Sequence, residues 1–218
     1  MVEINLLEKY PKINRDLTTR GNEKTEEDRE IARKFGKDFF DGDRKQGYGG
    51  YNYHPKFWTG VVNDMIDYYG LTEKSKIFDV GCGKGFMLHD FKKALPEIRI
   101  RGIDISEYAI KNSMEDTKRF LSVGNAKDLS IFDDKEFDLV ISINTVHNLE
   151  LNDCKQAIKE IQRVGKNSFI VNDAWNNDEE KEKMIKWNLT GRTFMHVDDW
   201  KKLFDEIGYT GDYYWFKP

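Results

Sequence analysis

The chain has 218 residues with a formal net charge of −4 and 34% charged residues, and its mean hydropathy is −0.73. A chain of this length can bury a full hydrophobic core, and the lack of any long uncharged apolar run excludes a membrane-spanning segment. Because the overall charge is acidic, we expect no general attraction to nucleic acid or anionic lipid, and the predicted partner is a small-molecule substrate.

Cysteine usage and the start of the sequence both predict a cytoplasmic protein. The two cysteines, Cys82 and Cys154, lack metal-ligand spacing, so we expect reduced thiols and no metal site. Residues 1–16 contain no basic stretch that leads into an apolar run, so no secretory signal is expected. The sequence leaves the oligomeric state open.

Residues 1–70 differ in character from the rest and are expected to form a helical, aromatic N-terminal extension. Residues 22–40 carry apolar side chains at helical spacing and predict one amphipathic helix. Residues 41–53 are glycine-rich, aromatic and too punctuated for a regular element, whereas residues 56–69 predict a second helix. We interpret this extension as a lid or a substrate-side cap on a Rossmann-like domain formed by residues 71–218.

Strands and helices alternate from residue 76 onward. The expected strands are residues 76–80, 99–103, 120–123, 137–143 and 168–173, and residues 209–216 are expected to form an aromatic strand or hairpin. The expected helices are residues 85–95, 107–119 (with Ser106 as N-cap), 153–164, 178–189 and 198–207. Such alternation indicates βαβ units, and therefore a doubly wound, three-layer α/β/α domain with a mostly parallel sheet. Ligands of such sheets bind at the carboxyl ends of the strands.

The first strand runs into a glycine turn, Gly81-Cys82-Gly83-Lys84-Gly85, which opens a helix. Glycine permits positive φ angles and lets a ligand approach bare backbone, and a helix N-terminus suits a nucleotide-like ligand. Asp104 ends the second strand 19 residues after Gly85, where a carboxylate is placed to bind ribose hydroxyls. These features fit NAD and S-adenosylmethionine equally well.

Three details favour S-adenosylmethionine over NAD. Apolar residues 86–88 follow Gly85, so the further glycine of a dinucleotide-binding turn is absent. Asp79, inside the first strand, would repel a pyrophosphate but would support a bound ammonium group. The loop 124–129 is rich in small residues and is suited to border an adenine ring.

Five segments resemble, in order and spacing, the successive motifs of class I S-adenosylmethionine-dependent methyltransferases of the small-molecule type. They are residues 77–85, 102–106, 124–129, 137–149 and 160–173. The resemblance implies S-adenosylmethionine as cofactor and a seven-stranded sheet whose last strand is antiparallel. The cofactor-binding residues that it implies are Asp79, Gly81, Gly83 and Gly85 around the methionine part, Asp104 at the ribose, Ile105, Asn125 and Ala126 around the adenine, and Cys82 and Asn144 beside them.

The strand 137–143 is expected to deliver residues 144–149 to the ligand edge of the sheet. His147 is the candidate general base, because neutral imidazole is available near pH 7. The alternative is that His147 packs on the cofactor or caps the next helix. Asn144 is not followed by the Pro-Pro-aromatic pattern of enzymes that methylate amino groups of nucleic acids, which again disfavours a nucleic-acid substrate.

Two segments are expected to line the pocket of the methyl acceptor. The candidate residues are Tyr48, Tyr51 and Tyr53 in the first segment and Trp175, Trp187 and Arg192 in the second. Aromatic residues on a glycine-rich loop suit a lid, and the alternative is a surface turn packed on the edge of the sheet. Arg192 is suited to pair with an anionic group of the substrate or, alternatively, with a surface acid.

The sequence therefore predicts a methyltransferase that transfers a methyl group from S-adenosylmethionine to oxygen or nitrogen of a small polar metabolite, such as a sugar or nucleotide-linked sugar. An NAD-dependent oxidoreductase is the first alternative, which Asp104 permits and the glycine spacing disfavours. A non-catalytic, cofactor-binding partner subunit is the second.

Overall fold

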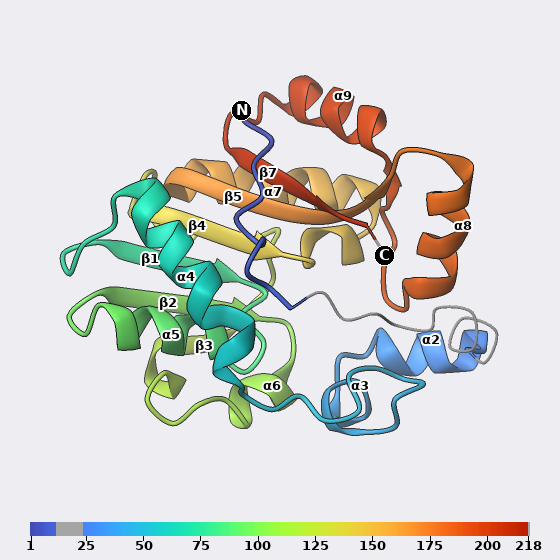
Figure 1. The fold of residues 1–218 in the computed structure, drawn as a ribbon, viewed down its shortest axis with the longest axis horizontal. Helices are drawn as coiled ribbons and strands as arrows, with labels where there is room; N and C mark the ends of the chain where they lie inside the picture. The colour runs from blue at the N-terminus through green and yellow to red at the C-terminus, as the bar shows by residue number, and fades with distance from the viewer. Residues whose placement is uncertain (12–23, 218) are drawn as a thin grey trace.

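The computed structural model describes residues 1–11 and 24–217, and at its centre lies a seven-stranded sheet in the order β3-β2-β1-β4-β5-β6, with β7 beside β5 (Figure 1). The strands are β1 (Lys76–Val80), β2 (Arg99–Asp104), β3 (Leu121–Val123), β4 (Phe137–Ile143), β5 (Gly165–Trp175), β6 (Met195–His196) and β7 (Asp212–Phe216). Helices cover both faces, so the expected three-layer α/β/α architecture is confirmed.

The last strand runs parallel to its neighbour, so the expected antiparallel orientation is wrong. The register pairs Phe169 of β5 with Asp212, and Asp173 with Phe216. The reason is the connection: α9 (Val197–Ile207) precedes β7, and a crossover helix returns the chain to the same end of the sheet, which produces a parallel strand. Every strand pair among the described residues is parallel.

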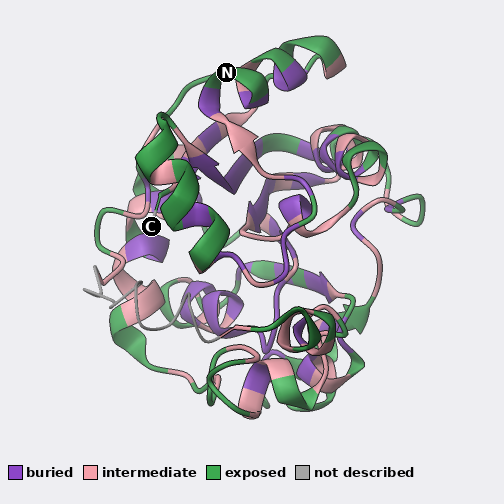
Figure 2. Ribbon diagram, turned by 90° about the vertical axis from the view of Figure 1, so that its right-hand side faces the viewer, coloured by how far each residue is buried: buried purple, intermediate pink, exposed green. Residues whose placement is uncertain are grey.

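Each face of the sheet has its own hydrophobic core. On one face, α4 (Pro55–Tyr69) and α5 (Phe86–Ala94) pack through fully buried side chains such as Met65. On the other face, α7 (Leu151–Val164) and α9 cover a second cluster that includes Trp200. Figure 2 shows that the strands are largely buried whereas the outer faces of the helices are exposed. No helix of the described part is long and apolar enough to cross a membrane.

The single helix expected over residues 22–40 is instead two, α2 (Glu26–Ala32) and α3 (Lys37–Asp41), and its expected first two residues lie outside the described part. The chain breaks at Phe35, which has a φ of 48°. This turn places the Phe35 ring edge-on to Phe39, with ring centroids 5.2 Å apart. The apolar side chains of this segment are therefore brought together by a bend that sets the two rings edge to face, and not by one continuous helix.

The helix expected over residues 107–119 is also shorter than predicted. It consists of α6 (Glu107–Lys111), and a 3₁₀ turn, η1 (Lys118–Phe120), follows it. Ser106 caps α6 as expected, because its Oγ accepts the N–H of Ala109 at 3.0 Å. The remaining helix is α8 (Asp178–Trp187), and the short strand β6 was not expected from the sequence.

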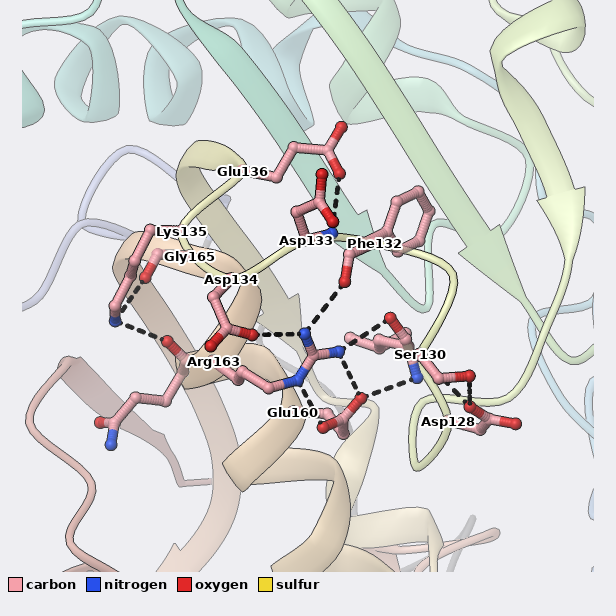
Figure 3. A network of polar contacts seen from close by, with 12 residues as sticks. Asp128, Ser130, Phe132, Asp133, Asp134, Lys135, Glu136, Glu160, Arg163 and Gly165 are labelled. Carbon is pink, nitrogen blue, oxygen red and sulfur yellow. Dashed lines mark hydrogen bonds and ion pairs between the residues drawn. The ribbon is translucent and has the colours of Figure 1, made fainter.

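Arg163 of α7 anchors the loop that joins β3 to β4. Its guanidinium donates two hydrogen bonds of 2.8 Å to the Glu160 carboxylate and one of 2.9 Å to each backbone carbonyl of Leu129 and Phe132 (Figure 3). Glu160 in turn accepts the N–H of Leu129 at 3.0 Å. This network fixes the end of the loop 124–129, the segment expected to border the adenine.

Candidate cofactor and acceptor site

A cavity of about 500 Å³ opens at the carboxyl ends of β1, β2, β4 and β5. One part of its wall is the glycine turn after β1, together with the residues that end β2 and follow β3 and β4. The opposite part comes from the N-terminal extension and from the segment around the end of α8. In Figure 1, α2, α3 and α8 gather at the end toward which the strands point. The cavity is therefore closed by segments far apart in the sequence.

The glycine turn allows a ligand to approach the backbone closely. Gly81 has a φ of +89°, and a Cβ added there would lie 2.0 Å from Thr145 Oγ1. Gly83 has a φ of +53°, and its added Cβ would lie 3.3 Å from the Tyr51 ring. Gly85, also at positive φ, packs against Thr117 and does not line the cavity. Glycine is thus required by both backbone conformation and space.

Two carboxylates lie at this end of the cavity. Asp79 is 4% exposed, and burial, with a smaller contribution from the charge of Asp104, raises its pKa to about 8. Asp104 accepts N–H groups of Gly83 and Ser106, each at 2.8 Å. Burial raises the pKa of Asp104, although these two hydrogen bonds oppose that rise. Because neither acid has a cationic partner among the residues that the structure describes, the buried Asp79 and the half-buried Asp104 favour a ligand that brings an ammonium group and hydroxyl donors.

The side chains beyond Asp104 suit a flat, apolar ring. Ile105 lines the cavity and is 53% exposed, which is high for an isoleucine. Asn125 and Ala126, from the loop after β3, line the cavity with it. Asn144 follows β4 at a φ of 51°, and its buried Oδ1 has no hydrogen-bond partner within the described residues. These residues fit the adenosine part of S-adenosylmethionine.

His147 lies in the wall of the cavity but is turned toward Asp173. Its Nδ1 accepts the backbone N–H of Asp173 at 3.4 Å, and its Nε2 lies 3.6 Å from the Asp173 carboxylate. The same carboxylate accepts a hydrogen bond of 2.6 Å from the side chain of Asn188. All three residues line the cavity and are at most 5% exposed. The sequence singled out His147 and missed the other two.

The structure brings only half of the expected acceptor residues to the cavity. Tyr48, Tyr51 and Trp187 line it. The others lie outside its lining: Tyr53 donates to Asp90 at 2.6 Å, Trp175 packs edge-on against Phe194, and Arg192 is 45% exposed and lies 3.7 Å from Glu150. For Arg192, the alternative of pairing with a surface acid agrees with this geometry.

Several lining residues carry no local signal in the sequence. Tyr10 lies with Phe57 and Trp58, at 5.4 and 5.2 Å between ring centroids, although 47 residues separate the first two. Phe216 of β7 lies 5.8 Å from Trp187. Asp173 was recognisable in principle, since an acid at the carboxyl end of a parallel strand points toward a ligand site. No group of three potential metal ligands occurs among residues 1–11 and 24–217.

Comparison with known proteins agrees with this geometry. A family model described as a methyltransferase domain matches residues 78–170, which hold the glycine turn, both carboxylates and the strand before His147. The putative methyltransferase YrhH of Bacillus subtilis (strain 168) is 26% identical over 114 residues, which make up 50% of this chain and 62% of YrhH. Residues 78–170 are thus similar to a methyltransferase domain. S-adenosylmethionine is the cofactor that this similarity implies.

Other relatives share only part of their length or only their fold with this chain. The mitochondrial arginine-hydroxylase NDUFAF5 of Mus musculus is 32% identical over 86 residues, 39% of this chain and 24% of that protein. The chain thus spans less than two thirds of the length of either curated relative. A solved SAM-dependent methyltransferase from Archaeoglobus fulgidus shares the fold, with a TM-score of 0.54 and 23% identity over 70% of this chain and 67% of that one. The methyl acceptor follows from none of these.

Proposed function

We propose that the chain transfers a methyl group from S-adenosylmethionine to an oxygen or nitrogen atom of a small polar metabolite in the cytoplasm. One observation carries the proposal: the glycine turn and the Asp79–Asp104 pair share a single cavity with aromatic side chains of the N-terminal extension. A cavity of about 500 Å³ has room for a cofactor and a small acceptor but not for a folded macromolecule. A sugar or nucleotide-linked sugar is the first acceptor to test.

In the proposed reaction, the chain positions its ligands and excludes water. When bound, S-adenosylmethionine supplies a methyl group that is already activated by a sulfonium. Asp79 would hold the ammonium group, Asp104 the ribose hydroxyls, and Ile105 the adenine face. The extension would act as the lid that keeps water out of the site. Good alignment of the reacting groups in such a site can supply ~7–11 kcal/mol of the activation barrier. His147 remains the candidate base for a hydroxyl acceptor, with the alternative role of holding Asp173.

Calorimetric titration with S-adenosylhomocysteine and with NAD tests this proposal against the oxidoreductase alternative. We expect micromolar affinity for S-adenosylhomocysteine and no binding of NAD. Asp104→Ala should weaken the affinity by about tenfold or more, because hydrogen bonds to a charged group are lost. Asp67→Ala, on the exposed side of α4, is the matched control and should change nothing. Binding of NAD alone would contradict the proposal.

The non-catalytic alternative needs a separate experiment. A metabolite pool incubated with S-adenosylmethionine that carries a labelled methyl group should yield a labelled small molecule only when the protein is added. The His147→Ala variant should bind S-adenosylhomocysteine normally but label its product at least about tenfold more slowly if His147 is the base. Tight binding of the cofactor with no labelled product would favour a partner subunit.

A further inference from the structure

The part of the cavity wall formed by β5 holds a buried acid, Asp173, near residues with aromatic side chains. Asp173 pairs in register with Phe216 of β7, so both side chains project on the same face of the sheet. Phe216 lies 5.8 Å from Trp187, and the next residue, Asn188, donates to Asp173. All of these residues line the cavity. The cluster of Asp173, Trp187, Asn188 and Phe216 is called the acid–aromatic corner below.

One oxygen of the Asp173 carboxylate remains available to a ligand. Oδ2 accepts the hydrogen bond from Asn188 at 2.6 Å and faces His147 Nε2 at 3.6 Å. Oδ1 has no hydrogen bond to any of the described residues, although Asp173 is only 4% exposed. Oδ1 is not one of the fully buried unpartnered atoms, so it can be reached from the cavity that Asp173 lines. A ligand that places a donor on Oδ1 would therefore gain a charge-assisted hydrogen bond.

His147 does not compete for that role. A neutral imidazole that accepts the Asp173 N–H at Nδ1 carries its proton on Nε2, the nitrogen that faces the carboxylate. In this arrangement Nε2 faces the Asp173 carboxylate at 3.6 Å, beyond hydrogen-bond distance, and His147 would act as the base of the proposed reaction only after its ring turns. Asn188 holds the carboxylate in place, so a donor for Oδ1 has to come from the cavity.

The rings beside Asp173 favour a donor that is positively charged. Aromatic faces attract ammonium groups within about 6 Å of the ring centroid. The Lys24 ammonium already lies 5.9 Å from the Trp187 centroid and donates to the Trp187 carbonyl at 2.8 Å. The Trp187 indole thus already accommodates one alkylammonium group. A carboxylate bordered by aromatic rings binds a cation better than it binds a neutral hydroxyl, because both contacts strengthen with positive charge.

We propose that the acid–aromatic corner is the recognition site for a positively charged nitrogen of the methyl acceptor, with Asp173 Oδ1 as its hydrogen-bond acceptor. This inference rests on the proposed function for the identity of the ligand as the acceptor. It narrows the substrate class from small polar metabolites to those that carry an amine. Asp173 is then a specificity-determining residue.

Three probes of the same shape but different charge test the inference. The full chain, with and without S-adenosylhomocysteine, is titrated with 2-phenylethylamine, 2-phenylethanol and phenylacetate. We expect the amine to bind at least about tenfold more tightly than the alcohol, and the acid to bind most weakly. Equal affinity for amine and alcohol, or no binding of any of the three, would overturn the inference.

Substitutions test whether the preference for amine over alcohol depends on Asp173. In Asp173→Asn, the affinities for amine and alcohol should agree within about twofold, with the affinity for S-adenosylhomocysteine unchanged. Asp178→Asn, in the exposed first turn of α8, should keep the wild-type preference. If Asp173→Asn does not fold, Trp187→Leu replaces it as the test. This variant should lose about three- to tenfold in affinity for the amine and keep its affinity for the alcohol. An amine preference that survives both substitutions overturns the inference.

The two proposals fail in different ways. If S-adenosylhomocysteine does not bind but the amine preference is present and is lost in Asp173→Asn, the recognition site stands and the methyltransferase proposal falls. If S-adenosylhomocysteine binds and no charge preference is found, the acid–aromatic corner does not recognise an amine and the methyltransferase proposal is unaffected.

Discussion

Burial, and to a smaller extent the charge of Asp104, raise the pKa of the Asp79 carboxyl to about 8. In the unfolded chain the pKa of an aspartate is about 3.9, so between these values the folded protein holds a proton that the unfolded chain has released. The contribution of Asp79 to stability is therefore fully present below about pH 4 and is lost as the pH rises through about 8. The reason is that an ionised carboxylate at this site would be buried and has no cationic partner in the part of the chain that the structure describes.

A pH series of unfolding experiments on the protein without cofactor tests this account. Wild-type protein should lose up to ~1.4 kcal/mol of unfolding free energy per pH unit through Asp79 as the pH rises from about 5 to about 8. Asp79→Asn cannot ionise and should show a shallower dependence, measured by urea unfolding at several pH values. Parallel curves for the two proteins would contradict the raised pKa.

The residues of the cofactor site were predictable because their signals are local. Asp79, the glycines and Asp104 lie within one βαβ unit, where strand, turn and next strand fix their relative positions. Asp173 and Phe216 meet through strand pairing between segments 43 residues apart, and no local pattern encodes that register. The register that joins Asp173 to Phe216 was therefore beyond sequence reasoning, although Asp173 ends a predicted strand and Trp187 was predicted from its segment after that strand.

At the scale of elements, α3 is joined to the glycine turn by a buried ion pair. Lys84 Nζ lies 2.7 and 2.9 Å from the Asp41 carboxylate oxygens and donates to the Tyr51 carbonyl at 2.9 Å. Tyr108 of α6 also donates to Asp41, at 2.7 Å. Burial alone would raise the pKa of Asp41, but the hydrogen bonds from Lys84, Tyr108 and the Tyr51 N–H together lower it. The extension is thus attached to the loop that would hold the cofactor.

Removing the cation of this pair should loosen the extension before the rest of the protein. Lys84→Met leaves Asp41 without its ion-pair partner, and we expect a local cost of about 1–3 kcal/mol, below the ~3–5 kcal/mol of a fully buried pair. Amide hydrogen exchange over residues 37–51 should become about 10- to 100-fold faster. Lys93→Met, exposed on α5, is the control. Unchanged exchange in Lys84→Met would show that the ion pair does not hold the extension.

Most strands and helices were predicted within a few residues, and the errors share one cause. The split between α2 and α3 at Phe35 and the parallel direction of β7 both depend on what the segment packs against. Helical periodicity identified the apolar face of the segment, but it passed over Gly36, which follows Phe35 and is the N-cap of α3. The aromatic pattern of residues 209–216 predicted a strand or hairpin, and the direction of the strand was set by the crossover through α9.

At the scale of the whole molecule, the two ends of the chain are joined to the same sheet. The backbone of Val2 and Ile4 exchanges hydrogen bonds of 3.0 and 2.9 Å with Tyr213 of β7. Leu6, 5% exposed, belongs to the core cluster that also contains Met65 of α4 and Phe91 of α5. The predicted boundary at residue 70 thus lies between segments that share one hydrophobic core.

This shared core predicts one cooperative unfolding transition in differential scanning calorimetry, with equal van't Hoff and calorimetric enthalpies. S-adenosylhomocysteine at about 100 times its Kd should add ~2.7 kcal/mol to the free energy of unfolding. For a chain of this length, that gain corresponds to a rise in Tm of about 5–10 °C. Leu6→Ala removes packing from the core and should lower the free energy of unfolding by ~2–5 kcal/mol. The single transition should move to lower temperature and should not split into two. NAD at equal concentration is the control and should leave the Tm unchanged. The contradicting result would be a second transition at lower temperature that shifts in Leu6→Ala while the main transition stays in place. The extension would then fold as a domain of its own, because one part can melt while the other stays folded only if the core is divided at residue 70.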